Sequence, residues 1–363
     1  MPLKLIKRPD STFWHIIGTV NGRRIRESTG TSSKKRAEEY RAKRESQAWQ
    51  ESIYGAKSVV TFSHAVLAYL EAEPRGEGTK AYLRRLLDFF HDTRLIDINQ
   101  EKLDEAYKVI LKKGIHSSQA TKKRAVNTPV CAVMRFAAHR GWCDPPLFAP
   151  VKVQTQPVKF LYPKEAIRLI EEAADHLKPL FIFLLGTGAR VSEALELEWK
   201  EVDLYGKQAT IWQKQQNKRR LDLPPIVIKT LQQLPHREGR VFRSTYRRTK
   251  ADGYHDNGRT SGGQFKRGWA GACRRAGFSG QYRKWSPKGE LSPREQFVPD
   301  ITPHIMRHTW ATWNYCLYRD PILLREMGGW KTLKMVEHYS KLIPPVYADE
   351  IRSFLGGDFL TRN

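Results

Sequence analysis

The chain has 363 residues, and its 63 lysines and arginines against 38 acidic residues give it a formal net charge of +25 and a pI near 9.9. It has no apolar run long enough to cross a bilayer, and its first residues lack a signal-peptide core, so we expect a soluble cytoplasmic protein of two or three domains. A chain this basic usually binds a polyanion, most often nucleic acid; a heavily solvated surface or a membrane-surface protein is the alternative.

The four cysteines are scattered along the chain, with no C-x-x-C pair. They are Cys131, Cys143, Cys273 and Cys316. This spacing fits neither a zinc site nor a disulfide framework, so we interpret them as core thiols.

Residues 3–57 predict three short strands followed by a helix. Asn21 and Gly22 form a two-residue hairpin signal between two strand-like runs, and serines precede a good helix former. A small sheet of this kind can lay a strand in a DNA groove. The second run supplies three candidate DNA-binding residues, Arg23, Arg24 and Arg26. A small folded appendage with basic edges is the alternative.

Residues 58–148 predict a bundle of about four amphipathic helices. Pro74, Gly76 and Gly78 separate the first two, and Gly114 ends the third.

The last of these helices begins with a cluster of basic residues, Lys122, Lys123 and Arg124. We expect these side chains to follow DNA phosphates, although a charge cluster is more often a solvated face.

A Pro-rich stretch at 149–160 reads as an extended linker, and residues 161–363 as a larger domain. This domain begins helical, contains a β segment near residues 206–224 and returns to helices. Its stretch at 245–300 is rich in Gly, Arg, Lys and Ser, and its pattern assigns no structure.

Three pieces of the larger domain stand out. "GARVSEALELEW" places Arg190 at the start of a helix, where backbone N–H groups favour an anion. "HIMRHTWAT" places His304 and Arg307 on one helix face, and the forked donors of an arginine match phosphate oxygens. "GWKTLKMVEHY" carries Trp330 and, further along a predicted helix, Tyr339. Each piece alone fits an ordinary surface or core.

Together these pieces resemble the tyrosine recombinases, or phage-type integrases. The first piece is similar to the family's G-x-R-x-x-E-x-x-x-L-x-W run, with Arg190 as its first arginine and Glu193 as the acidic residue behind it. The second is similar to its H-x-x-R-H-T-x-A-T box. The third has the family's nine-residue step from Trp330 to Tyr339.

The resemblance implies catalytic roles for six residues: Arg190, Lys214, His304, Arg307, Trp330 and the nucleophile Tyr339. The tyrosine would attack a DNA phosphodiester to give a 3′-phosphotyrosine, and the arginines would stabilise the extra charge of the transition state. The histidine would accept the tyrosine's proton, the lysine would protonate the leaving oxygen, and the tryptophan N–H would contact a phosphate oxygen.

Two departures from the family pattern concern the lysine and the basic stretch. The β-hairpin that carries the lysine is one residue longer than common, so Lys218 competes with Lys214. The stretch before His304 is unusually long; it resembles a family helix near residues 262–277 followed by an insertion. His308 is expected to form a hydrogen bond inside the fold.

The resemblance also implies the fold class: multidomain, mainly α with small β parts. The expected order is an arm-type DNA-binding domain (1–57), a helical core-binding domain (58–148), the linker (149–160) and a mixed α/β tyrosine-recombinase catalytic domain (161–363) that ends in a tail helix. Such a tail packs on a neighbouring subunit or folds back on its own domain.

The function expected is a site-specific recombinase that integrates or excises a phage or mobile element, without metal, ATP or other cofactor. Its partners would be double-stranded DNA attachment sites, three further copies in a homotetramer and accessory DNA-bending proteins, with no membrane, in the nucleoid of a host cell. A type IB-like topoisomerase and a catalytically inactive DNA-binding architectural protein are the alternatives.

Overall fold

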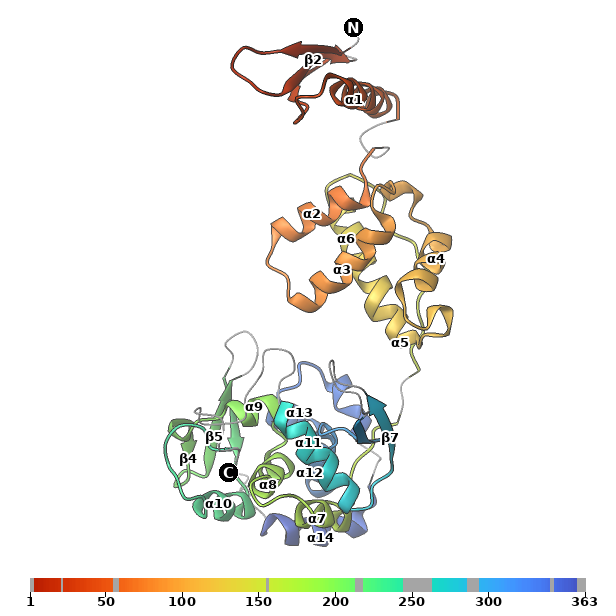
Figure 1. Ribbon diagram of the computed structural model, residues 1–363. Coiled ribbons are helices and arrows are strands. Elements are labelled where there is room, and N and C mark those ends of the chain that lie inside the picture. Colours follow the sequence, from red (N-terminus) through yellow and green to blue (C-terminus); the bar gives the residue numbers. More distant parts are fainter. Residues whose placement is uncertain are drawn as a thin grey trace. The chain divides into compact units, whose positions relative to one another are not determined.

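The computed structural model describes residues 3–20, 22–54, 59–154, 157–212, 218–243, 263–285, 294–339 and 343–357. The chain divides into two compact units, Met1–Thr155 and Gln156–Asn363 (Figure 1). In the part described, no helix is long and apolar enough to span a membrane.

The first unit begins with a three-stranded antiparallel sheet. Its strands, in the order β1-β2-β3, are Lys4–Lys7, Trp14–Val20 and Arg23–Ser28. Val20 pairs with Arg23, so two residues turn the chain between β2 and β3, and Gly22 has a φ of +83° that suits a glycine. The predicted hairpin is confirmed.

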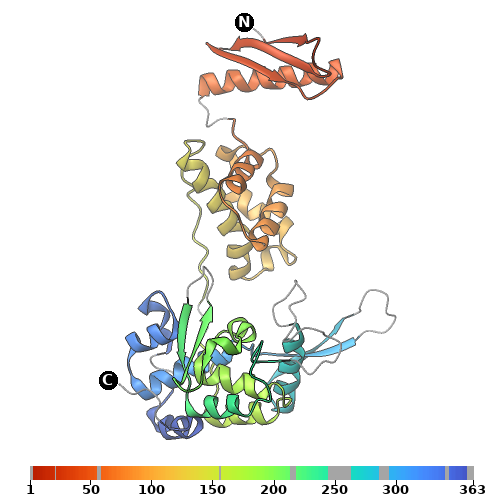
Figure 2. The ribbon, with the colours of Figure 1, turned by 90° about the vertical axis from the view of Figure 1, so that its left-hand side faces the viewer.

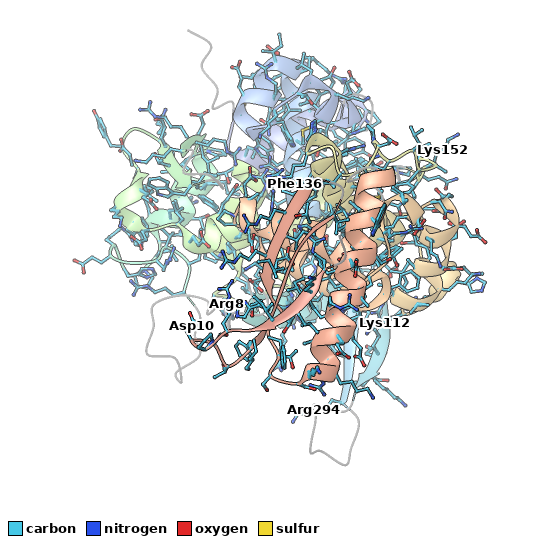
Figure 3. The ribbon with its side chains drawn as sticks, turned by 90° about the horizontal axis from the view of Figure 1, so that it is seen from above. Arg8, Asp10, Lys112, Phe136, Lys152 and Arg294 are labelled. Carbon is cyan, nitrogen blue, oxygen red and sulfur yellow. The ribbon has the colours of Figure 1, made fainter. Side chains whose placement is uncertain are left out.

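Helix α1 (Lys34–Tyr54) runs along one face of this sheet (Figure 2). Ala48 of the helix packs on Ile16 and Ile25 of the strands, and Arg44 forms an ion pair with Glu27 at 3.1 Å. The turn between β1 and β2 holds Arg8 and Asp10, which lie at one end of the sheet (Figure 3).

A helical bundle follows within the first unit. Its helices are α2 (Phe62–Ala72), α3 (Glu77–Phe90), α4 (Gln100–Ile110), α5 (Gln119–Lys122) and α6 (Thr128–His139). Thr61, Asn99 and Ser118 cap α2, α4 and α5 by accepting a hydrogen bond from a backbone N–H of the first turn. The helices bury one shared apolar core.

Three details of the bundle differ from the sequence prediction. The last predicted helix is interrupted by a π-helical turn at Lys123–Asn127, because Pro129 has no N–H for the usual bond to the carbonyl four residues earlier. Gly78 lies inside the first turn of α3 and does not precede it. Helix α4 ends at Ile110, where Leu111 becomes extended and enters the core, and not at Gly114.

The second unit is built around helix α8 (Lys178–Thr187), in which every residue from Pro179 to Leu185 is apolar. It contacts α7 (Pro163–Glu171), α10 (Pro225–Gln232) and α12 (Ile305–Tyr318), so most of its surface is buried. The remaining α-helices are α9 (Val191–Glu196), α11 (Gly263–Arg275), α13 (Pro321–Gly328) and α14 (Ala348–Leu355). Cys273 and Cys316 are free thiols buried in this core.

Two small antiparallel sheets lie on opposite sides of the second unit (Figures 1 and 2). One holds β4 (Val202–Asp203), β5 (Gln208–Trp212) and β6 (Lys218–Asp222), the predicted β segment. The other pairs β7 (Gly280–Trp285) with β8 (Arg294–Pro299), within the stretch to which the sequence assigned no structure. Helix α11 agrees with the family helix expected there.

The tail helix α14 folds back on its own unit. Ile351, Phe354 and Leu355 are buried in the core of that unit, and the ring of Phe354 meets the edge of Trp313 with the centroids 5.2 Å apart. Of the two arrangements that the sequence left open, the structure has the intramolecular one.

We predict that Trp313→Ala destabilises the second unit by about 3–5 kcal/mol, because it empties a large volume of the core. Trp313 is 1% exposed, and its indole N–H donates a 3.0 Å hydrogen bond to the carbonyl of Leu161. The melting temperature of the full chain measures the effect. Tyr205→Ala is the control, since that side chain is 99% exposed and should be neutral; an equal shift for both variants would contradict this packing.

Candidate active site

Arg190 stands where a sharp turn leads from α8 into α9. Gly188 ends α8 with a φ of +63°, and a Cβ there would lie 2.2 Å from the ring of Trp310. Only glycine fits this turn without strain or collision. Arg190 is therefore held at the N-terminus of α9 with 42% of its side chain exposed.

The carboxylate of Glu193 lies at the N-terminus of α9, where backbone N–H groups favour an anion. One of its oxygens accepts the backbone N–H of Arg190 at 2.8 Å, and the other accepts the Arg190 guanidinium at 2.5 Å. Arg219, a buried residue of β6, approaches the same carboxylate at 3.3 Å. Burial alone would raise the pKa of Glu193, but the hydrogen bonds from Arg190 and the charge of Arg219 lower it, so this carboxylate is ionised.

Arg307 connects the turn after α8 to the end of α13. Its Nη1 donates to the carbonyl of Gly188 at 2.5 Å and its Nη2 to the carbonyl of Gly328 at 2.6 Å. The side chain is buried, and its guanidinium carbon lies 4.5 Å from the centre of the Trp330 ring. Burial, Arg219 and Arg190 lower the pKa of Arg307 to about 9, which leaves it charged at neutral pH.

Tyr339 lies inside the unit and close to His308. The Tyr339 hydroxyl and His308 Nδ1 are 2.9 Å apart and share a hydrogen bond, and the side chain is 5% exposed. The Tyr339 and Trp330 rings are 5.5 Å apart. Burial raises the pKa of Tyr339, and the charge of Arg307 opposes the rise.

The segment that carries Tyr339 is not the continuous helix predicted. It consists of two 3₁₀ turns, Leu333–Met335 and Glu337–Tyr339. Between residues 331 and 339 only Val336 and Tyr339 are buried. Because a helix in a protein is stabilised mainly by packing of an apolar face, this is too little buried surface to stabilise a longer helix here.

His304 is the residue that precedes α12, and its ring meets that of His308 edge-on at 4.6 Å. Desolvation by the surrounding protein and the charges of Arg307 and Arg190 lower the pKa of His304, although its side chain is exposed. Burial, His304 and Arg307 lower the pKa of His308 to about 4. Both rings are therefore neutral at neutral pH.

The second unit thus brings together five of the six predicted catalytic residues, Arg190, His304, Arg307, Trp330 and Tyr339. The sixth, Lys214, lies outside the described residues. Its competitor Lys218 begins β6 and places its Nζ 4.5 Å from the centre of the Trp212 ring.

The predicted DNA-binding residues lie in the first unit. Arg24 and Arg26 are exposed on one face of β3, opposite the buried Ile25; Arg23 belongs to the same strand. Lys123 and Arg124 are exposed in the π-helical turn, and Lys122 Nζ lies 5.4 Å from the centre of the Tyr107 ring.

Sequence reasoning missed two parts of the site. It gave no role to Arg219, whose only signal was its position between Lys218 and Arg220 in a short alternating strand. It expected a hydrogen bond from His308 but not that the partner is the Tyr339 hydroxyl. The described residues contain no group of three or more His, Cys, Asp or Glu side chains placed to hold a metal ion.

The sequence and the fold match known proteins. Residues 159–344, just over half of the chain, match the Phage integrase family, and residues 4–52 match the phage integrase N-terminal domain. The integrase of Salmonella phage P22 is 27% identical over 98% of this chain and 95% of its own.

Solved integrase structures share the fold. The Tn1549 transposon integrase, in complex with transposon right end DNA, is 16% identical with a TM-score of 0.56, and the match covers 82% of this chain and all of that one. A lambda integrase tetramer bound to a Holliday junction is 14% identical with a TM-score of 0.56, over 92% of this chain and 94% of that one. The chain belongs to the phage integrase family and is a site-specific tyrosine recombinase.

Proposed function

We propose that this recombinase cleaves and rejoins double-stranded DNA attachment sites through Tyr339, with Arg190, Arg307, His304 and Trp330 around the reacting phosphate. One observation carries the proposal: three guanidinium groups and a carboxylate form one cluster, and the Arg307 member of that cluster lies against Trp330 and acts on Tyr339. The arginines are Arg190, Arg219 and Arg307 and the carboxylate is that of Glu193. Three positive charges less one negative leave a net charge of +2.

This charge matches the reaction. A phosphodiester gains negative charge on its non-bridging oxygens when a hydroxyl attacks it, and fixed guanidinium groups stabilise that charge without moving. Arg190 is the arginine that reaches solvent, so it is placed to contact the phosphate first. Arg307 is buried and holds the frame of the site through two carbonyls.

The proton of Tyr339 has two neutral imidazoles near it. His308 touches the hydroxyl in this conformation, and His304 lies against His308 at the exposed side of the pair. A lowered pKa keeps both rings able to accept a proton at neutral pH. With 5% exposure, Tyr339 reaches a DNA phosphate only after its segment moves outward, and His304 then becomes the acceptor on the side of the DNA.

The proposed reaction needs neither ATP nor a metal ion. Bond energy kept in a phosphotyrosine allows rejoining without ATP, and the arginine cluster supplies the positive charge that a metal would otherwise provide. Lys214 is proposed to protonate the leaving 5′ oxygen.

The exposed arginines of β3 and the basic cluster at 122–124 are proposed to contact DNA. Four copies are proposed to assemble on paired sites, because the related lambda integrase forms a tetramer on a Holliday junction.

We predict that Tyr339→Phe abolishes the covalent protein–DNA complex while DNA binding persists. The substrate is a duplex that carries the attachment core, nicked so that the cleaved strand cannot rejoin, and it is incubated without metal. A denaturing gel detects the complex. Tyr315→Phe, a neighbouring tyrosine on α12, should cleave like the wild type. A complex that survives Tyr339→Phe would contradict the assignment of the nucleophile.

We predict that Arg307→Lys lowers the cleavage rate by about 100-fold or more, because an ammonium keeps the charge but cannot hold two carbonyls and a phosphate in fixed directions. Single-turnover cleavage of the same duplex measures the rate, and a melting curve checks the fold. Arg325→Lys on α13, whose partner is the neighbouring Glu326, should cleave normally. A rate within a few-fold of wild type would exclude a geometric role for Arg307.

We predict that acid destabilises the wild type more than His308→Asn. The folded-state pKa of His308, about 4, lies below its ordinary value of 6.5, so the unfolded chain binds the proton first, and stability falls as the pH drops from about 6.5 toward 4. Melting temperatures at pH 7 and pH 5 measure the loss, which should be smaller in the variant. His338→Asn changes an exposed histidine of the Glu337–Tyr339 turn and serves as the control. Equal losses for wild type and His308→Asn would refute a half-buried, neutral imidazole at this position.

A further inference from the structure

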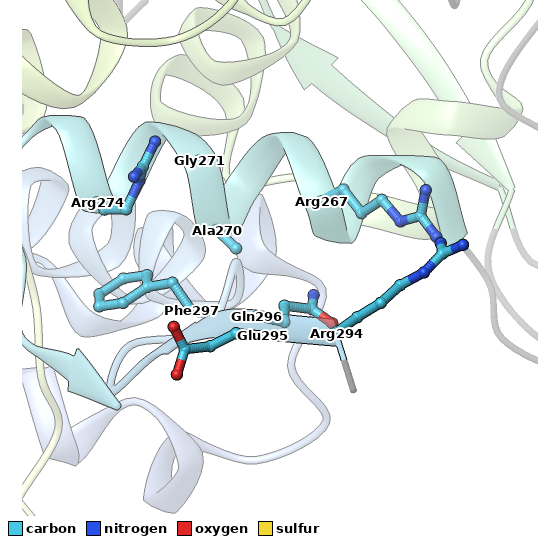
Figure 4. Close-up of a pocket in the computed structure, with 8 residues that line it drawn as sticks. All are labelled: Arg267, Ala270, Gly271, Arg274, Arg294, Glu295, Gln296 and Phe297. Carbon is cyan, nitrogen blue, oxygen red and sulfur yellow. The ribbon is translucent and has the colours of Figure 1, made fainter. Parts of the chain in front are cut away.

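A groove of about 300 Å³ lies between α11 and β8, in the basic stretch to which the sequence assigned no structure. It shares no residue with the cluster around Tyr339. Figure 4 shows the residues that line it: Arg267, Ala270, Gly271 and Arg274 from α11, and Arg294, Glu295, Gln296 and Phe297 from β8.

The groove has arginines at its sides and small residues at its base. Arg267 and Arg274 are seven residues apart, so they lie on one helix face about 10 Å from each other along the axis. The small residues Ala270 and Gly271 lie between them, and their lack of bulk leaves the groove open at its base. On the opposite wall, Arg294 of β8 lies at the same end of the groove as Arg267 (Figure 4).

Positive charge therefore gathers along the α11 side of the groove. In the part of the chain that the structure describes, neither Arg267 nor Arg274 has an ion-pair partner, whereas the adjacent Arg275 pairs with Glu172 at 3.7 Å. Glu295 is the one carboxylate among the lining residues. Arg267 and Arg274 therefore keep their donors for a bound anion, and a hydrogen bond between a guanidinium and an anion is among the stronger ones.

We propose that this groove binds the phosphodiester backbone of DNA at a place separate from the active site. Two arginines about 10 Å apart span more than one phosphate, so the groove suits a chain of phosphates better than a single free anion. The hairpin adds exposed positive charge beside the groove, because Arg283 and Lys284 of β7 are exposed on its two faces. The proposal rests on the proposed function in that DNA is the polyanion.

The test compares Arg267→Gln/Arg274→Gln with Lys164→Gln/Lys229→Gln, both in the full chain. The control removes the same two charges from exposed lysines of α7 and α10. Affinity for an attachment-core duplex is measured from 0.05 to 0.3 M salt. Each lost phosphate contact lowers the slope of log K against log salt by about one, so the arginine variant should lose about two and bind roughly tenfold more weakly at physiological salt. The control should keep the wild-type slope.

Equal slopes and affinities for the two double variants would overturn the proposal. A second arm measures melting temperatures with and without inorganic pyrophosphate. Stabilisation of the wild type but not of the arginine variant, with unchanged DNA affinity, would instead make the groove a small-anion site and would also overturn it. Failure of the proposed function is a different result: wild-type protein that binds the nicked duplex but forms no covalent complex.

Discussion

The buried guanidinium of Arg307 is the interaction on which the candidate site depends. One side chain on α12 takes the carbonyl of Gly188 at 2.5 Å and that of Gly328 at 2.6 Å, and so fixes two turns that are distant in sequence. The first turn presents Arg190, and the second leads to Trp330 and Tyr339. Both turns need glycine, because a Cβ at Gly188 would strike Trp310 and one at Gly328 would strike Trp330. The motif residues are therefore close together because a charged group is used as a structural link.

The excess positive charge of this site lowers the stability of the fold but favours the binding of an anion. Three arginines near one carboxylate repel each other, and burial adds a desolvation penalty, as the lowered pKa values of Arg219 and Arg307 indicate. Glu193 offsets part of this cost and leaves the remainder for an incoming anion. Desolvation and the same positive charges lower the pKa of both histidines and keep them neutral, which is the form able to accept a proton from Tyr339. Binding of a phosphate is thus linked to relief of repulsion within the protein.

The sequence predicted most of the fold and the types of residue at the site, but not their partners. The two-residue hairpin after Val20 and the apolar α8 follow from local patterns that tertiary contacts do not override. Strands β7 and β8 escaped notice because their exposed faces carry charged side chains where a pattern of alternating apolar residues would be expected. The hydrogen bond between His308 and Tyr339 joins residues 31 positions apart, so only the packing of the 3₁₀ turns on α12 determines it. The roles of the site residues, Lys214 included, stay predictions until they are tested chemically.

Identification of the atom that joins DNA to the protein tests the account most directly. The covalent complex formed on a nicked duplex is digested with trypsin and nuclease, and the modified peptide is sequenced by mass spectrometry. Cleavage after Lys334 and Lys341 yields a short peptide in which Tyr339 is the single tyrosine. The account predicts a nucleotide attached through its 3′ phosphate to that peptide, with a 5′ hydroxyl on the released strand. A nucleotide on any other peptide, or a linkage through a 5′ phosphate, would contradict it.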